Sequence, residues 1–297
     1  MPMIQARDDT QIYVKTLGQG RPVVLIHGWP LSADSWDPIM IALAEAGYRA
    51  IAYDRRGFGR SDHAPTGYDY DTFADDLADV MTATGATQDA ALVGFSMGGG
   101  EIARYMSRHG GRGVSQAVLV SSVVPYMLKT EDNPNGVPES VFQQMTEGMK
   151  SDFRHFFTSF FKDFYGVGLL SHPVSDEELR WAWMTTMKAS QYATLQAAAA
   201  FAYTDFRPDL PYFKVPTLVI HGTSDKTVPI DATGRVVADQ VPDAQLVEYL
   251  GEPHAVFATQ TQRLCSDLLR FLAGENVENR QEVIDAMTAQ AMATQPL

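Results

Sequence analysis

Short apolar runs alternate with longer segments of helical spacing along most of this chain. The apolar runs predict strands at 12–17, 22–27, 49–54, 90–95, 116–121, 217–221 and 245–249. The segments in which apolar residues recur three and four positions apart predict helices at 36–46, 72–84, 99–108, 231–241 and 256–272. Such alternation is typical of a parallel sheet whose strands are joined by crossover helices, so we expect an α/β fold.

The region 123–214 interrupts this alternation. It is rich in aromatic residues and methionine, lacks a β-branched run, and predicts helices at 139–164 in two pieces, at 176–187 and at 190–201. Prolines are frequent at both of its ends, which is typical of a boundary between units. We therefore expect a helical cap, 123–214, inserted into a core made of 1–122 and 215–275. The remaining tail, 276–297, is expected to be a docking helix or a frayed end.

Composition narrows the range of partners. The 36 acidic and 23 basic residues give a formal net charge of −13, which repels phosphate backbones and anionic membrane surfaces. We therefore expect neither nucleic acid nor a membrane as partner. The 297 residues, 45% hydrophobic and 20% charged, predict an ordered globular protein with one large domain and an insertion.

Cysteine content and the start of the chain bear on its location. Cys265 is the only cysteine, which excludes an intrachain disulfide and a thiolate zinc cluster. Residues 1–9 have neither a basic start nor an apolar stretch, and no window reaches the ~18 apolar residues of a membrane span. We expect a cytoplasmic protein without an export signal.

The segment 94–98, GFSMG, follows an apolar run and precedes a helical stretch. A Gly-x-Ser-x-Gly pattern in that context is typical of a nucleophile elbow, where a sharp turn exposes a serine hydroxyl at the edge of the sheet. Ser96 is therefore the candidate nucleophile. The pattern alone arises by chance in roughly one chain in ten of this composition, so it needs a matching base and acid.

A serine hydroxyl becomes nucleophilic when a base takes its proton and an acid holds that base. In hydrolases with this elbow the chain order is serine, acid, histidine. Asp225 lies in the turn after the strand at 217–221, and His254 is the only histidine that follows it. Taken singly, Asp225 could be an ordinary turn residue and His254 a surface loop residue. Because all three agree in order and context, we predict a catalytic triad of Ser96, His254 and Asp225.

The tetrahedral intermediate of acyl transfer needs backbone N–H donors for its negative charge. The residue after the nucleophile, Met97, supplies one donor. The loop at 27–30 supplies the other, and there Trp29 keeps its amide hydrogen whereas Pro30 has none. We predict an oxyanion hole formed by the amides of Trp29 and Met97. The alternative role of Trp29, a core aromatic, concerns only its side chain.

Four motifs resemble those of a known family: HGWP at 27–30, DRRGFGRS at 54–61, GFSMGGG at 94–100 and GTSD at 222–225. From about residue 3 to 272, the chain resembles the cofactor-free (non-haem) haloperoxidase, aryl esterase and perhydrolase branch of the α/β-hydrolase superfamily. The resemblance implies a mostly parallel central sheet flanked by helices, with the helical cap after strand 6. It also implies the same triad and oxyanion amides. The chain departs from the family beside the base, at Glu252 and Ala255.

The resemblance implies a serine esterase that acts on aryl or short-chain carboxylic esters through an acyl-enzyme on Ser96. It further implies a perhydrolase side activity like that of non-haem chloroperoxidases, in which hydrogen peroxide replaces water and yields a peracid. Such chemistry needs no metal and no cofactor. In this family the proline after the oxyanion tryptophan is associated with higher perhydrolase activity, which points to Pro30.

The family pattern and the positions of residues near the elbow or in the cap suggest the substrate pocket. We expect it to be lined by Trp29, Pro30, Val123, Met127, Phe160, Phe164, Phe201 and Val228. For any one of these residues, plain core packing is an equally weighted alternative. An apolar pocket favours aryl or short-chain acyl esters over charged substrates. Asp54, Arg55 and Arg56 are interpreted as a structural charge network.

Other functions stay open at this point. A lactonase or lactamase would use the same triad and differ only in its leaving group. A non-catalytic binding member of the fold is an alternative of a different class, because fold does not determine function. Haloalkane dehalogenases carry aspartate at the elbow, so Ser96 argues against them. The natural ester and the oligomeric state, a homo-oligomer included, also stay open.

Overall fold

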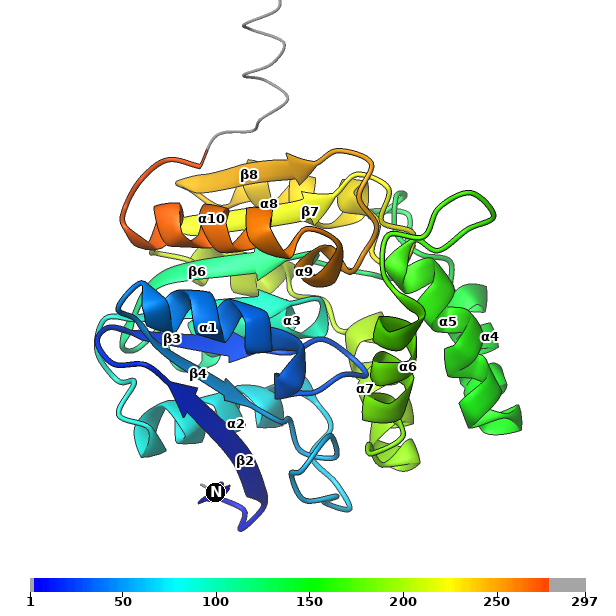
Figure 1. The fold of residues 1–297 in the computed structure, drawn as a ribbon, viewed down its shortest axis with the longest axis horizontal. Helices are drawn as coiled ribbons and strands as arrows, with labels where there is room; N and C mark the ends of the chain where they lie inside the picture. Colours follow the sequence, from blue (N-terminus) through cyan, green and yellow to red (C-terminus); the bar gives the residue numbers. More distant parts are fainter. Residues whose placement is uncertain (1–2, 278–297) are drawn as a thin grey trace, which may run out of the picture.

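The structure is a computed structural model that describes residues 3–277, and it contains one large twisted sheet (Figure 1). Within these residues eight strands pair in the order β1-β2-β4-β3-β5-β6-β7-β8. β1 and β2 are antiparallel to their neighbours, and the remaining pairs are parallel. The strands are β1 Met3–Gln5, β2 Gln11–Leu17, β3 Pro22–Ile26, β4 Arg49–Tyr53, β5 Ala90–Phe95, β6 Val114–Val120, β7 Thr217–Gly222 and β8 Ala244–Tyr249.

The predicted α/β fold is confirmed. Every strand expected from an apolar run is present, with ends within two residues of the prediction. β1 was missed because it is a three-residue edge strand whose side chains are mostly exposed, so it contains no apolar run. In contrast, every residue of β3 and β5 is buried, which explains why these parallel strands read as continuous apolar runs.

Helices cover both faces of the sheet. α1 and α10 lie on one face, and α2, α3 and α8 lie on the other (Figure 1). Three helices that were expected as single units are each preceded by a separate short helical segment. The helices of the core are η1 Ala33–Trp36 and α1 Asp37–Glu45, α2 Tyr70–Ala83, α3 Met97–Arg108, η3 Ile230–Ala232 and α8 Gly234–Gln240, and α9 Val256–Thr259 and α10 Thr261–Leu272.

Four helices between β6 and β7 form the predicted cap. They gather at the end of the sheet toward which the parallel strands point (Figure 1). These are α4 Glu139–Ser151, α5 Phe153–Tyr165, α6 Asp176–Thr186 and α7 Gln191–Tyr203, followed by the short η2 Arg207–Tyr212. Asp152 separates α4 from α5, because its backbone is extended and its carboxylate accepts the N–H of His155 as an N-cap. The division at 123–214 stays a prediction.

The end of the described chain packs on the sheet. The Val277 N–H donates to the side-chain oxygen Oε1 of Gln245 in β8 at 2.9 Å. Of the predicted tail, 276–297, only residues 276 and 277 lie among the described residues. Among residues 3–277, no helix is both long enough and apolar enough to cross a membrane.

The crossing of β5 into α3 requires glycine at two positions. A Cβ on Gly94 would lie 2.6 Å from the carbonyl carbon of Gly98, and a Cβ on Gly98 would lie 2.5 Å from the carbonyl oxygen of Ile26. Between these glycines, Ser96 has φ 53° and ψ −117°, a conformation that L-residues rarely adopt. Helix α3 therefore starts directly against β3 and β5, and Ser96 stands at the carboxyl end of the sheet.

The close approach at Gly98 predicts a measurable loss of stability in Gly98→Ala. Alanine normally favours a helix over glycine by about 1 kcal/mol. We nevertheless expect the free energy of unfolding to fall by about 1–3 kcal/mol, because the methyl group meets backbone atoms that cannot move aside. Denaturant unfolding measures the difference. Gly168→Ala is the control, since open space surrounds Gly168; equal stability of the two variants would contradict this account.

Candidate active site

The three predicted triad residues lie together at the carboxyl end of the sheet. Ser96 follows β5, Asp225 follows β7 and His254 follows β8. His254 Nε2 lies 2.9 Å from Ser96 Oγ, and His254 Nδ1 lies 2.6 Å from Asp225 Oδ2. Since the carboxylate accepts the Nδ1 hydrogen, Nε2 is left to accept the hydroxyl proton of Ser96. The arrangement can generate a serine nucleophile.

The Asp225 carboxylate is held as an anion. Its Oδ1 accepts the backbone N–H groups of Thr227 and Val228, each at 2.8 Å. Burial alone raises the pKa of the Asp225 carboxyl. The neighbouring charge of His254 and the hydrogen bonds from His221 and His254 outweigh burial and hold that pKa well below its usual range. Asp225 therefore keeps its negative charge and can stabilise a protonated His254.

Two aromatic rings fix the orientation of His254. Ring centroids of Phe95 and Phe164 lie 5.0 Å and 4.9 Å from the imidazole centroid. Phe164 was expected to line the substrate pocket, but its side chain is fully buried against the base and does not reach the cavity. The Ala255 N–H donates to the Phe164 carbonyl at 3.1 Å, so α5 of the cap is bonded directly to the loop that carries the base.

The two predicted oxyanion amides have no competing acceptor. Among the residues that the structure describes, neither the Trp29 nor the Met97 N–H donates to a protein group. Met97 is the first residue of α3, where free N–H groups and the helix dipole favour an anion. The Trp29 loop lies against the elbow, because a Cβ on Gly28 would come 2.5 Å from the Phe95 ring. Both donors are thus free to bind a developing oxyanion.

His27 holds the backbone of the Trp29 loop. Its Nε2 accepts the Arg55 N–H at 3.0 Å, so Nδ1 carries the hydrogen and donates to the Gly28 carbonyl at 2.9 Å. Burial, together with the charge of Arg55, lowers the pKa of the His27 imidazole well below its ordinary value. A neutral imidazole of one tautomer therefore fixes the loop.

A buried ion pair connects this loop to the elbow helix. The Arg55 guanidinium pairs with Glu101 on α3 and also donates to the His27 carbonyl at 2.7 Å. Tyr53 donates its hydroxyl to the same glutamate. The side chains of the pair are at most 1% exposed, so removal of either partner would leave a buried charge unpaired. The network links the segments that carry Trp29 and Met97.

The neighbours of Arg55 form further ion pairs. Asp54 Oδ2 lies 2.7 Å from Arg60 Nε, and Arg56 Nε lies 2.6 Å from Asp76 Oδ2. The Asp54 carboxylate also accepts the backbone N–H of Ala33. These contacts agree with the interpretation of residues 54–56 as a structural network.

A cavity of about 200 Å³ opens onto Ser96 and His254. Among the residues expected to line it, the structure places there Trp29, Val123, Met127, Phe160, Phe201 and Val228. Pro30, like Phe164, is buried outside this lining. The sequence reasoning missed other lining residues, namely Val137, Val141, Phe142, Met145, Asp163, Lys226 and Thr227. The helical spacing of Val141, Phe142 and Met145 on one side of α4 was an available signal.

The side chain of Trp29 joins the oxyanion loop to the cap. Its indole N–H donates to the carbonyl of Thr194 on α7 at 2.9 Å. Its ring packs against Phe157, Phe160 and Phe201, with centroid separations of 5.3 to 5.5 Å. The wall of the cavity and the second predicted oxyanion donor therefore belong to one residue.

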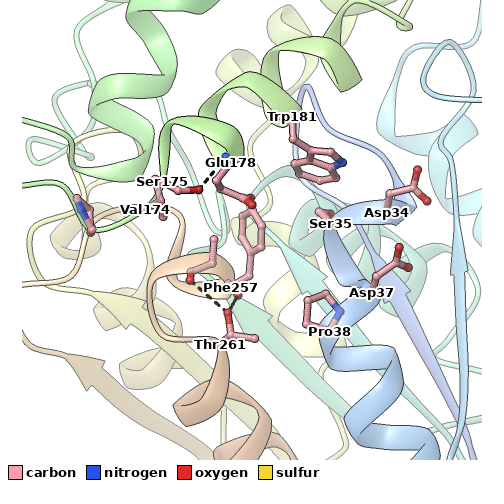
Figure 2. Close-up of a pocket in the computed structure, with 12 residues that line it drawn as sticks. Asp34, Ser35, Asp37, Pro38, Val174, Ser175, Glu178, Trp181, Phe257 and Thr261 are labelled. Atoms are coloured by element: carbon pink, nitrogen blue, oxygen red, sulfur yellow. Dashed lines mark hydrogen bonds between the residues drawn. The ribbon is translucent and has the colours of Figure 1, made fainter.

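A second and larger cavity, of about 440 Å³, lies among η1, α1, α6, α9 and α10 (Figure 2). Carboxylates of Asp34, Asp37 and Glu178 line it, but no histidine does. Its hydroxyls have structural partners: Ser175 caps α6 by accepting the Glu178 N–H, and Thr261 donates to the Phe257 carbonyl. Because no histidine lines this cavity to activate a hydroxyl, the smaller cavity at Ser96 is the candidate active site.

Comparison with known proteins agrees with the fold and the motifs. The sequence matches the α/β hydrolase fold family over residues 21–261. This chain belongs to the α/β-hydrolase family. It is 43% identical to the non-heme chloroperoxidase CPO-A1 of Kitasatospora aureofaciens over 274 residues, which cover 92% of this chain and 99% of that protein.

Two further similarities place this α/β-hydrolase in the predicted branch. It is 37% identical to the bifunctional esterase/perhydrolase DCH of Acinetobacter calcoaceticus, across 92% of this chain and 99% of that one. The crystal structure of a bromoperoxidase from Bacillus anthracis superimposes with a TM-score of 0.88 and 41% identity, across 92% and 99% of the two chains. The resemblance to the cofactor-free haloperoxidase and esterase branch is thus confirmed.

Proposed function

We propose that this α/β-hydrolase is a serine esterase that cleaves aryl or short-chain carboxylic esters. The observation that carries the proposal is the chain of hydrogen bonds from Ser96 to His254 to Asp225, at 2.9 Å and 2.6 Å, at the base of an apolar cavity. The similarity to a protein named an esterase/perhydrolase supports it. An apolar lining favours uncharged acyl and aryl groups.

Each residue has a defined task in the proposed reaction. His254 removes the hydroxyl proton as Ser96 Oγ attacks the ester carbonyl, and the oxyanion forms between the amides of Trp29 and Met97. His254 then passes the proton to the leaving alkoxide, which departs as the alcohol. Water attacks the acyl-enzyme by the same steps, so the carboxylic acid is released and Ser96 regains its proton.

Hydrogen peroxide can replace water in the second half of the proposed reaction. His254 would take a proton from peroxide as the peroxide oxygen attacks the acyl carbon, and the product is then a peracid. The similarity to proteins named chloroperoxidase and perhydrolase supports this side activity. Pro30 directly follows Trp29, the proposed oxyanion donor. Replacement of Pro30 can therefore shift the backbone carbonyl groups near the nucleophile.

Ser96→Ala tests the nucleophile. We expect kcat for an aryl acetate to fall by at least about 10⁴-fold, because no group remains to form the acyl-enzyme. Labelling by a fluorophosphonate should disappear as well, while the melting temperature stays within a few degrees. Ser266→Ala, an exposed serine on α10, is the matched control. Activity near that of the wild type would remove Ser96 from the mechanism.

Comparison of single and double variants tests whether Ser96 and His254 act as a unit. His254→Ala and Ser96→Ala should each lower kcat about as much as the double variant does, because either loss disables the same nucleophile. Steady-state kinetics of the three variants provide the comparison. Losses that add up in the double variant would show that the two residues act independently.

Pro30→Leu tests the preference between peroxide and water. We expect the rate of peracid formation to fall relative to the rate of ester hydrolysis, since leucine changes the backbone beside the oxyanion donor. Both rates are measured on one ester with and without hydrogen peroxide. An unchanged ratio would separate Pro30 from the choice of nucleophile.

A further inference from the structure

A second histidine contacts the acid of the triad. His221, near the end of β7, has Nε2 at 3.2 Å from Asp225 Oδ2 and at 2.9 Å from the carbonyl oxygen of Val228. The side chains of His221 and Asp225 are both fully buried. Because a carboxylate and a carbonyl can only accept, Nε2 of His221 must carry the hydrogen.

The other ring nitrogen of His221 has no role as a donor. In the described part of the chain, Nδ1 is buried without a hydrogen-bond partner. Gly234 closes the space beside it, since a Cβ on that residue would lie 2.9 Å from Nδ1. A hydrogen on Nδ1 would therefore have no acceptor, so the hydrogen that makes contacts lies on Nε2. His221 is a donor whose tautomer the fold determines.

We propose that His221 is a positioning residue, whose Nε2–H holds Oδ2 of Asp225 in line with Nδ1 of His254. This inference rests on the proposed function. The two histidines approach the same oxygen through opposite ring nitrogens, Nδ1 in His254 and Nε2 in His221. Only the Nε2 of His254 is left free for Ser96, so the two rings have different tasks.

The contacts of the carboxylate show why this donor matters. Two backbone N–H groups, from Thr227 and Val228, anchor Oδ1 and leave the carboxylate free to tilt at Oδ2. His254 also binds Oδ2, but His254 changes its charge in each proposed catalytic cycle. His221 does not contact Ser96 and takes no part in the proposed proton transfer, so its contact with Oδ2 keeps the plane of the carboxylate constant while His254 gains and loses a proton. The hydrogen bond from Nε2 to the Val228 carbonyl, at 2.9 Å, secures the turn that supplies the Oδ1 donors, and the same N–H faces Oδ2 of Asp225 at 3.2 Å.

The test compares His221→Gln with His221→Met. The glutamine amide can place an N–H near the position of Nε2, whereas methionine has similar length and no donor. With an aryl acetate we expect kcat to fall about 10- to 100-fold in the methionine variant, KM to stay within about twofold, and glutamine to restore most of the loss. His172→Met, an exposed histidine between α5 and α6, is the control.

A second measurement does not depend on turnover. The hydrogen shared by His254 Nδ1 and Asp225 should give a downfield proton NMR resonance in the wild type, at a hydrogen bond of 2.6 Å. We expect this resonance to persist in the glutamine variant and to be lost or exchange-broadened in the methionine variant. It can be recorded in a Ser96→Ala background, so its result stands even where the ester assay detects no esterase.

Two results would overturn the inference. One is a methionine variant that keeps both the wild-type kcat and the resonance. The other is an equal loss of kcat in both variants that follows a fall in melting temperature, which would assign His221 to packing alone. If the methionine variant does not fold, His221→Asn replaces it, because its shorter amide cannot reach Asp225. Equal activity of the asparagine and glutamine variants would then reject the role.

Discussion

The left-handed backbone at Ser96, with φ 53°, is the constraint on which the candidate site depends. A non-glycine residue in such a conformation costs about 1–3 kcal/mol and persists only where its surroundings hold it. Here β3, β5 and α3 meet so closely that Gly94 and Gly98 have no room for a side chain. The strained turn directs the hydroxyl out of the sheet and places the Met97 N–H at the start of a helix.

Buried charges position the groups around this turn. Arg55 and Glu101 connect the Trp29 loop to α3, so the backbone amides of Trp29 and Met97, the proposed oxyanion donors, are held relative to each other. On the other side of Ser96, Asp225 is held by backbone N–H groups and by two histidines. A buried charge lowers the stability of the folded protein unless every partner is present. Such networks therefore order a site more than they stabilise a fold.

The cap completes the site. Trp29 donates to α7 and packs on α5, while the loop of His254 is bonded to α5 through the Phe164 carbonyl. The cap helices therefore contact both the Trp29 loop and the loop that carries His254. The same helices supply apolar residues to the wall of the cavity, and in the proposed reaction an apolar wall would strengthen the electrostatic interactions at the reacting carbonyl.

The order of elements along the chain was sufficient to predict the sheet and the three residues at its edge. Parallel strands end at one edge, so residues that directly follow β5, β7 and β8 meet there whatever the details of packing. That rule predicted from the sequence that Ser96, Asp225 and His254 lie close together. The missed strand β1 is too short to show a pattern.

The lining of the cavity depended on the packing of the cap. Helical spacing shows which residues share a face of α4 or α5, but not which face meets the core, so Phe164 was assigned to the pocket although it lies behind the imidazole. The contact of His221 with Asp225 was likewise not predicted, because the sequence pattern of a buried histidine in a strand does not differ from that of other core residues. This contact spans four residues of a turn whose path is determined by long-range packing, and no local pattern encodes that path.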